Sequence, residues 1–246
     1  MLKPSKSIKI LKHQSSTCRD NFNLICWNIE KLSLSEKFKK YLQELIVKEK
    51  LDFLLLQEVK KETQEDMDLE GFSYILSLNM QTKKYLYGVL SAFKISCINE
   101  KKLLTSSKEL SLLTHKSSLF TLHNIKNNQE LLVVNIHAIN FVTSKSFRKE
   151  LDYIQSQISP FKGALIVAGD FNAWSKKRVE ILRDFAQSLN LVKVNLKDEK
   201  NIKKVFNKTL DFVFYRGLEV KSAKVINCDT FSDHNPIIVK FAVPKT

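Results

Sequence analysis

The sequence predicts a layered α/β protein, a sandwich of two mixed, mainly antiparallel sheets with helices outside them. Three observations predict this class. Apolar runs of strand length recur along the whole chain, and those between residues 72 and 125 are separated only by polar turns. Three other stretches carry apolar residues at helical spacing. The apolar fraction of 43% is ordinary for a globular protein and allows a sizeable core.

The N-terminal part begins with residues 1–20, which are polar, basic and without period, so we expect a loose arm there. Residues 22–28 and 51–58 are apolar enough to form buried strands. Between these strands we predict a helix that begins after Ser33 or Ser35, either of which is a suitable N-cap. The apolar stripe of this helix consists of Phe38, Tyr41, Leu42, Leu45 and Ile46.

The middle of the chain is expected to form short antiparallel strands over residues 72–78, 85–93, 94–98 and 117–125. Later strands are predicted over residues 131–138, 164–172, 210–215, 218–226 and 235–241. The two remaining helices are expected near residues 145–158 and 177–189.

Residues 21–246 are expected to form a single domain, because no stretch rich in Pro, Gly or Ser divides them. The four cysteines are widely spaced and form no CxxC pair, which argues against a zinc site and a disulfide framework. No apolar run is long enough to cross a bilayer, and the basic N-terminus lacks the apolar region of a secretory signal. We therefore expect a monomer in the cytoplasm, with export by a machine that reads no such signal as the alternative location.

The net charge of +14 favours a polyanionic partner, through attraction to phosphate. Nucleic acid is the first candidate partner, and a phospholipid headgroup is the second. Only five of the 40 basic residues are arginine, the residue whose planar fork grips phosphate in a bidentate way. A lysine excess that reflects coding bias is therefore an alternative explanation.

The polar residues of interest each lie at the end of an apolar strand. In a sheet with antiparallel neighbours, the C-terminal ends of some strands lie beside the N-terminal ends of others, so one rim can collect them all. Carboxylates, carboxamides and imidazoles on one rim form the oxygen-rich pocket that Mg²⁺ prefers, with Mn²⁺ as an alternative. These residues are Asn28, Gln57, Glu58, His137, Asp170, Asn172, Asp211, Asp233 and His234.

Taken singly, these residues have ordinary explanations. A glutamate such as Glu58 is usually a solvated strand end, and Asn28 alone is more often a turn residue than a ligand. Asp170 with Asn172 would cap a loop, and His137 on an apolar strand would be a core histidine. His13, His115 and His123 carry no motif, so we expect them at the surface.

Six short strings in this chain resemble the successive motifs of the endonuclease/exonuclease/phosphatase superfamily, in its order. They are CWNIE (26–30), LLLQEV (54–59), NIHAIN (135–140), AGDFNAW (168–174), LDFVF (210–214) and SDHNPI (232–237). The later strings also resemble the bacterial YafD-like branch of that superfamily. The resemblance implies a DNase I-like α/β/β/α sandwich of four layers and a divalent-metal-dependent phosphodiester hydrolase.

The resemblance also implies a role for each matching residue. Glu58 would be the principal metal ligand, assisted by Asn28 and Asp233. Asp170 and Asn172 would orient the attacking water and the phosphate. The resemblance leaves open whether Asp170 or His234 takes the proton from water.

Two histidines complete the implied site. Asp211 would hydrogen-bond His234, fix its tautomer and favour its charged form. His137 stands where DNase-like members carry a second histidine, which contacts phosphate and serves as an acid.

Substrate contacts are expected around these motifs. Asn140 and Arg148 follow His137 closely enough to border a cleft, although Arg148 also suits the exposed face of its helix. Trp174 is a candidate for stacking on a base, with a core or rim aromatic as the alternative. The lysines of residues 197–208 would line a nucleic-acid groove or form a solvated loop.

A nuclease acting on DNA or RNA is the leading hypothesis for function. The rival hypothesis is a phosphoesterase acting on phospholipid or small phosphate esters, because the same residues could hydrolyse a phosphate ester whatever group the phosphate is attached to. A non-catalytic nucleic-acid-binding module is the third. The chain departs from abasic-site endonucleases, which carry a tyrosine-containing motif in place of NIHA, and it lacks the PAWCDR-type motif of inositol polyphosphate phosphatases.

Overall fold

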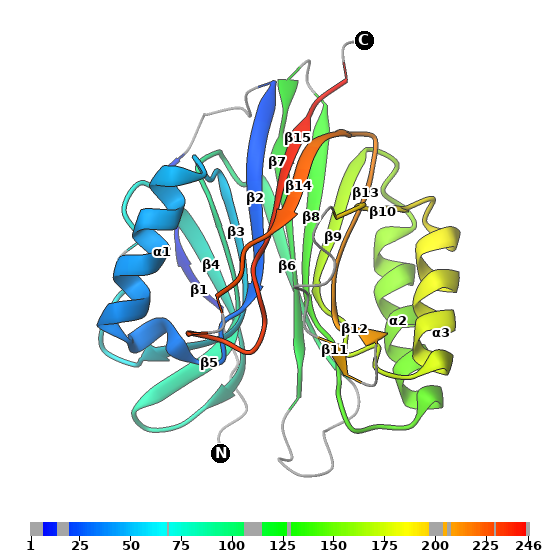
Figure 1. The fold of residues 1–246 in the computed structure, drawn as a ribbon, viewed down its shortest axis with the longest axis horizontal. Coiled ribbons are helices and arrows are strands. Elements are labelled where there is room, and N and C mark those ends of the chain that lie inside the picture. Colours follow the sequence, from blue (N-terminus) through cyan, green and yellow to red (C-terminus); the bar gives the residue numbers. More distant parts are fainter. Residues whose placement is uncertain are drawn as a thin grey trace.

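The protein is built in four layers. The computed structural model describes residues 7–13, 20–67, 69–105, 115–126, 129–196, 204–205, 208–228 and 230–244. Two sheets lie face to face, with helix α1 (Glu36–Lys48) outside one and helices α2 (Ser144–Ile158) and α3 (Lys176–Ser188) outside the other (Figure 1). The predicted α/β/β/α sandwich is confirmed.

The strands form two mixed sheets. The first contains, in spatial order, β1 (Ile8–Ile10), β4 (Ser73–Gln81), β5 (Tyr85–Phe93), β3 (Phe53–Glu62), β2 (Asn21–Asn28), β15 (Ile237–Ala242) and β14 (Glu219–Val225). The second contains β10 (Val192–Lys193), β13 (Asp211–Arg216), β9 (Ala164–Asp170), β8 (Glu130–His137), β7 (Ser117–Asn124) and β6 (Asn99–Leu104). A separate hairpin joins β11 (Lys204–Val205) to β12 (Lys208–Thr209).

Each sheet contains a parallel pair near its centre, and these pairs set the position of the site. Strands β2 and β3 run parallel with Asn28 opposite Gln57, and β8 and β9 run parallel with His137 opposite Asp170. The C-terminal ends of a parallel pair lie side by side. Strand β13 is antiparallel to β9 and begins with Asp211 opposite Asp170, so its first residue joins the same edge.

Apolar side chains fill three spaces between the layers. Between the sheets lie the inward-facing residues of both, among them Phe22, Phe53 and Phe241. The stripe of α1 packs on the outer face of the first sheet, and α2 and α3 pack on the outer face of the second. The predicted N-cap Ser35 accepts a hydrogen bond from the amide of Phe38, which fixes where α1 begins.

Two predictions about elements need correction. Within the expected loose arm, residues 8–10 form strand β1, which pairs with β4, while residues 1–6 and 14–19 lie outside the described part. Residues 94–98 form no strand; β6 begins at Asn99 instead. Strand β6 lies at the edge of its sheet, and its first four residues are polar and alternate between exposed and half-buried, so it lacks the apolar run that would have predicted it.

His123 is buried, contrary to the expected surface position. Its ring lies between Phe53 and Phe93, with centroid distances of 5.2 and 4.7 Å. Its two nitrogens lie 2.9 Å from the carbonyl oxygen of Ser96 and 2.9 Å from Oγ1 of Thr121. Burial lowers the pKa of His123 to about 4.

This buried histidine should make folding stability depend on pH. The pKa of His123 is about 4 in the folded protein and about 6.5 when unfolded, so the unfolded chain takes up the proton first. Stability from the neutral ring is therefore complete above pH 6.5 and is lost as pH falls towards 4. Relative to a His123→Gln variant, we expect the wild type to lose about 3 kcal/mol of unfolding free energy between pH 7 and pH 4.

Urea unfolding of both proteins at several pH values measures this difference directly. The informative quantity is the difference in unfolding free energy between the two proteins. The raised pKa of the buried Asp170 makes both proteins more stable as pH falls over the same range, and this contribution cancels in the difference. A gap that stays constant between pH 7 and pH 4 would show that His123 does not titrate as described.

Candidate active site

The strand ends of the two sheets meet at one rim, where the buried residues Asn28, His137, Asp170, Asn172, Asp211 and His234 are joined by the half-buried Glu58. Strand β15 starts shortly after the turn that carries His234, and its first residue, Ile237, lies opposite Cys26 near the C-terminal end of β2. The turn is fastened to β2 by two hydrogen bonds. Nε1 of Trp27 donates to the carbonyl oxygen of His234 at 2.7 Å, and Oγ of Ser232 donates to that of Asn28 at 2.8 Å.

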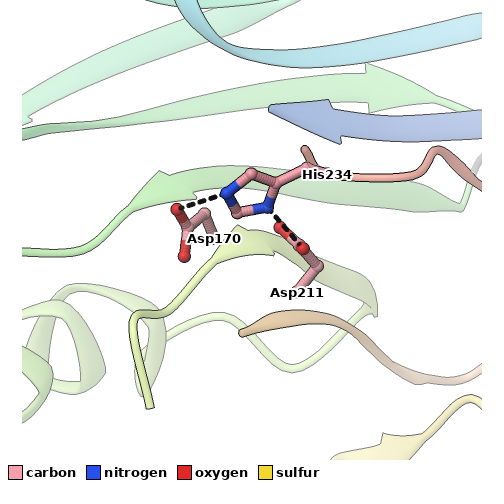
Figure 2. A group of neighbouring side chains, drawn as sticks. All are labelled: Asp170, Asp211 and His234. Atoms are coloured by element: carbon pink, nitrogen blue, oxygen red, sulfur yellow. Dashed lines mark hydrogen bonds and ion pairs between the residues drawn. The ribbon is translucent and has the colours of Figure 1, made fainter. Parts of the chain in front are cut away.

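Asp211, His234 and Asp170 form a line of polar groups (Figure 2). Nδ1 of His234 lies 2.7 Å from Oδ2 of Asp211, and Nε2 lies 3.9 Å from Oδ2 of Asp170. A carboxylate at Nδ1 fixes the ring and leaves Nε2 as the atom that faces the second carboxylate. The predicted contact between Asp211 and His234 is therefore present.

Asp170 is held in place by the two asparagines of the site. Its Oδ1 accepts from the backbone amide of Asn172 at 2.9 Å, and its Oδ2 accepts from Nδ2 of Asn28 at 3.1 Å. The side chain of Asn172 donates to the carbonyl oxygen of Ala138 at 3.0 Å. Gly169 precedes Asp170 with a φ of 145°, and a Cβ at this position would collide with the carbonyl oxygen of Ile136. Glycine is therefore required at this point of the strand.

The carboxyl of Asp170 carries an unusual pKa. Burial raises it and the neighbouring Asp211 raises it further, to about 6, against the opposing effect of His234. A carboxyl with a pKa in this range exchanges protons with water near neutral pH. Such a group is suited to acid–base chemistry.

Glu58 and His137 form the other part of the rim. Glu58 has a φ of 54° and lies in a β-bulge of β3, where the register to β5 shifts between Leu56 and Val59. A bulge turns a side chain away from the regular alternation of a strand. Oε1 of Glu58 lies 3.6 Å from Nε2 of His137, which itself lies 3.9 Å from Oδ2 of Asp170. Both carboxylates therefore lie near the same nitrogen of His137.

Two lysines also contact Glu58. Nζ of Lys31 lies 2.7 Å from Oε2, and Nζ of Lys116 lies 3.9 Å from Oε1. Although burial raises the pKa of Glu58, the ammonium groups of Lys116 and Lys31 outweigh this effect and hold the pKa below its usual value. Glu58 is therefore ionised at neutral pH.

His137 is surrounded in a way that keeps it neutral. Burial lowers its pKa well below the usual value, and Lys116 lowers it further. Nζ of Lys116 lies 3.0 Å from Nε2 of His137. Because an ammonium group only donates, this nitrogen is the acceptor. The acid role that the resemblance implies for His137 is not favoured by this arrangement.

The remaining predicted residues lie at or beyond the rim. Asp233 is exposed, with 52% of its side chain accessible, and its Oδ1 lies 3.7 Å from Nε2 of His234. Oδ1 of Asn140 accepts from Nε1 of Trp174 at 2.9 Å, so these two side chains support one another. Arg148 is not part of the cluster, because it points from α2 to Asp184 of α3 in an exposed ion pair. The predicted lysines of residues 197–208 lie outside the described side chains.

Sequence reasoning missed one buried arginine that orders the site. Arg178, in the first turn of α3, donates to the carbonyl oxygens of Ile139, Asn172 and Val142 at 3.2, 2.9 and 2.9 Å. Its guanidinium also stacks on the ring of Trp174. Arg178 therefore ties the loop after His137 to the loop after Asp170. The sequence signal that could have identified Arg178 is its position in the first turn of the helix that follows the GDFN string.

The donor set fits a hard divalent cation. Asp170, Asp211 and His234 each offer a ligand atom within 4.8 Å of the others, and all three are buried. Oδ1 of Asp211 has no hydrogen-bond partner among the described residues. A cation beside two buried carboxylates would reduce the repulsion between them, and carboxylate oxygens are what Mg²⁺ and Mn²⁺ prefer.

Comparison with known proteins identifies relatives over most of the chain. The model of the Endonuclease/Exonuclease/phosphatase family matches residues 25–234. A UPF0294 protein of Photorhabdus laumondii is 32% identical over 232 residues, which are 92% of this chain and 85% of the relative. A UPF0294 protein of Yersinia enterocolitica is 46% identical over 127 residues, 51% of this chain and 48% of the relative. The latter match thus spans about half the length of that relative.

Three solved structures share the fold. The human Nocturnin catalytic domain with bound sulfate anion has a TM-score of 0.68 and 21% identity, and 97% of each chain is covered. A mannosyl-6-phosphatase of Bacteroides thetaiotaomicron has a TM-score of 0.68 and 14% identity, with 90% and 99% covered. The endonuclease domain of the retrotransposon TRAS1 has a TM-score of 0.63 and 14% identity, with 92% and 100% covered. At these identities the likeness shows the fold.

Proposed function

Since this chain belongs to the endonuclease/exonuclease/phosphatase family, we propose that it hydrolyses phosphodiesters with a divalent cation and that its substrate is nucleic acid. The observation that carries the proposal is the convergence of Glu58, Asp170, Asp211 and His234 from distant parts of the chain. Such an oxygen-rich rim with one ordered imidazole suits attack of water on phosphorus.

We propose that Glu58, Asn28 and Asp233 hold the metal, with Mg²⁺ as the resident ion and Mn²⁺ as a substitute, and that the buried carboxylates of Asp170 and Asp211 add negative charge beside it. A bound divalent cation would stabilise the negative charge on the oxygens of the phosphate. Glu58 is ionised, as a ligand must be.

Asp170 is proposed as the group that takes the proton from water, because its pKa of about 6 suits a base near neutral pH. The backbone amide of Asn172 and the side chain of Asn28 hold both of its oxygens and so fix its direction. Asp211 orients His234, whose Nε2 faces Asp170 and would stabilise negative charge as it develops on the phosphate.

Nucleic acid is favoured as substrate by the net charge of +14 and by an exposed aromatic residue in the loop that follows His137. Phe141 is 63% exposed with a φ of 48°, and it follows His137 by four residues. Arg178 holds the carbonyl oxygens of the residues at 139 and 142, on both sides of Phe141. The ring is thus presented to solvent by an anchored loop, as a base-stacking side chain needs to be.

A Phe141→Ala variant tests this substrate class. We expect kcat/KM on single-stranded nucleic acid to fall about 10-fold, in line with the loss of one stacking contact. Hydrolysis of bis(p-nitrophenyl) phosphate, which offers no base, should change by less than about twofold. An equal loss on both substrates would mean that Phe141 supports the site itself and does not bind a base.

A substrate panel tests the proposed reaction. Plasmid DNA, RNA, sphingomyelin and phosphoinositides are compared with Mg²⁺ and with chelator. We expect cleavage of DNA or RNA that chelator abolishes. Cleavage of the phospholipids alone would instead support the rival phosphoesterase, and nucleic-acid binding without turnover would support the non-catalytic module.

Among the described residues, none of the helices has the length and apolar character needed to cross a membrane. The cytoplasmic location and the monomeric state that we expect from the sequence stay predictions.

A further inference from the structure

Lys116 lies inside the candidate active site without matching any of the motifs. It directly precedes β7, and only 14% of its side chain is accessible. Its Nζ lies 3.0 Å from Nε2 of His137 and 3.9 Å from Oε1 of Glu58. A lysine head group is almost never buried unless it is paired, so these contacts are unlike those of an ordinary surface lysine.

The backbone around Lys116 is fixed in a way that keeps the side chain at the rim. Its amide donates to Oγ1 of Thr105 at 3.0 Å, and its carbonyl oxygen accepts from the amide of Thr105 at 3.0 Å. His115 adds a contact of 2.6 Å between its Nδ1 and the carbonyl oxygen of Thr105. The ammonium group is therefore delivered to the site from an anchored segment.

We propose that Lys116 binds the phosphate group of the substrate, with His137 as the hydrogen-bond acceptor that holds its ammonium in place. This inference rests on the proposed function, because it assigns a residue to the phosphodiester that the same rim would hydrolyse. A lysine ammonium is a compact positive charge that recognises phosphate oxygens. In a largely buried position its attraction for an anion is stronger than at the surface.

The placement of Lys116 has a second consequence, for the metal. A positive charge 3.9 Å from Oε1 of Glu58 competes with a divalent cation for the same carboxylate. Lys31 competes as well, since its Nζ lies 2.7 Å from Oε2 of Glu58. Its side chain is 54% accessible, so solvent screens its charge more strongly. Lys31 is therefore a matched control that shares Glu58 as partner and carries the same charge.

The experiment compares Lys116→Met, Lys116→Arg and Lys31→Met with the wild type. Titration calorimetry measures the affinity for Mn²⁺ alone and, in the presence of Mn²⁺, for inorganic phosphate. Lys116→Met is expected to weaken phosphate binding by about 10-fold or more, the loss of one charge-assisted contact. Lys116→Arg keeps the charge and should retain phosphate affinity within about threefold.

The two methionine variants separate binding of phosphate from competition for Glu58. Both should bind Mn²⁺ more tightly than the wild type, whereas only Lys116→Met should lose affinity for phosphate. Equal phosphate affinity in Lys116→Met and in Lys31→Met would overturn the proposal. If Lys116→Met fails to fold, Lys116→Gln takes its place, and a phosphate affinity equal to that of the wild type would overturn the proposal.

These outcomes are independent of the reaction itself. Should the substrate panel find no hydrolysis, the proposed function fails, while the phosphate and Mn²⁺ titrations still report on Lys116. Should hydrolysis be found with no effect of Lys116→Met on phosphate affinity, the proposed function stands and the role of Lys116 fails.

Discussion

A Glu58→Gln variant is expected to lose about 100-fold or more in affinity for Mn²⁺ and about 10³-fold in turnover. The reason is electrostatic. Glutamine has nearly the same shape but no charge, and it leaves Lys31 and Lys116 without the carboxylate that they contact. Titration calorimetry with Mn²⁺ and hydrolysis of bis(p-nitrophenyl) phosphate measure the two losses.

A control for this variant is available on the same strand. Glu62→Gln removes an identical charge from the last residue of β3, four positions beyond Glu58. It should bind Mn²⁺ within about twofold of the wild type, because it lies outside the cluster at the rim. If Glu58→Gln bound Mn²⁺ as tightly as Glu62→Gln does, Glu58 could not be the principal ligand.

An Asp211→Asn variant is expected to lower turnover by about 10²- to 10⁴-fold, the range that an oriented acid–base group contributes. The carboxylate of Asp211 lies 2.7 Å from Nδ1 of His234, and a neutral carboxamide can neither stabilise positive charge on the ring nor secure its tautomer. Steady-state kinetics on bis(p-nitrophenyl) phosphate measure the loss. Asp184→Asn, which removes an exposed carboxylate paired with Arg148, is the control.

His234 and Asp211 should behave as one unit. A His234→Ala variant is expected to lose about as much turnover as Asp211→Asn, and the double variant should lose little more than either. Mn²⁺ affinity should fall less in His234→Ala than in Glu58→Gln, because Glu58 is the proposed principal ligand. Additive losses in the double variant would show that the two side chains act separately.

The rim was predictable because apolar runs locate strands and polar residues mark where they stop. Asn28 and Asp170 each close a buried strand, and both prove to lie at the C-terminal end of a parallel pair. The pairing of Asp211 with Asp170 follows from one antiparallel register. The order of the six strings then predicted the family, which the match over residues 25–234 confirms.

The parts that escaped prediction are those where local pattern is weak. Strand β1 has only three residues, and most residues of β6 are polar. Both strands lie at the edge of a sheet, where few of their side chains are buried, so neither has an apolar run of strand length. Lys116 and Arg178 belong to residue types that are usually exposed, so only their contacts in space reveal them. Arg148 was placed near the cleft by its distance along the chain, although its helix turns it towards Asp184.

The most direct test is a crystal structure with Mn²⁺ and inorganic phosphate, in which anomalous scattering locates the metal. We predict a Mn²⁺ ion coordinated by Glu58, with the phosphate between that ion and His234. A metal bound elsewhere on the protein, with Glu58 still paired only to lysines, would contradict the claim that this rim holds a cation against phosphorus.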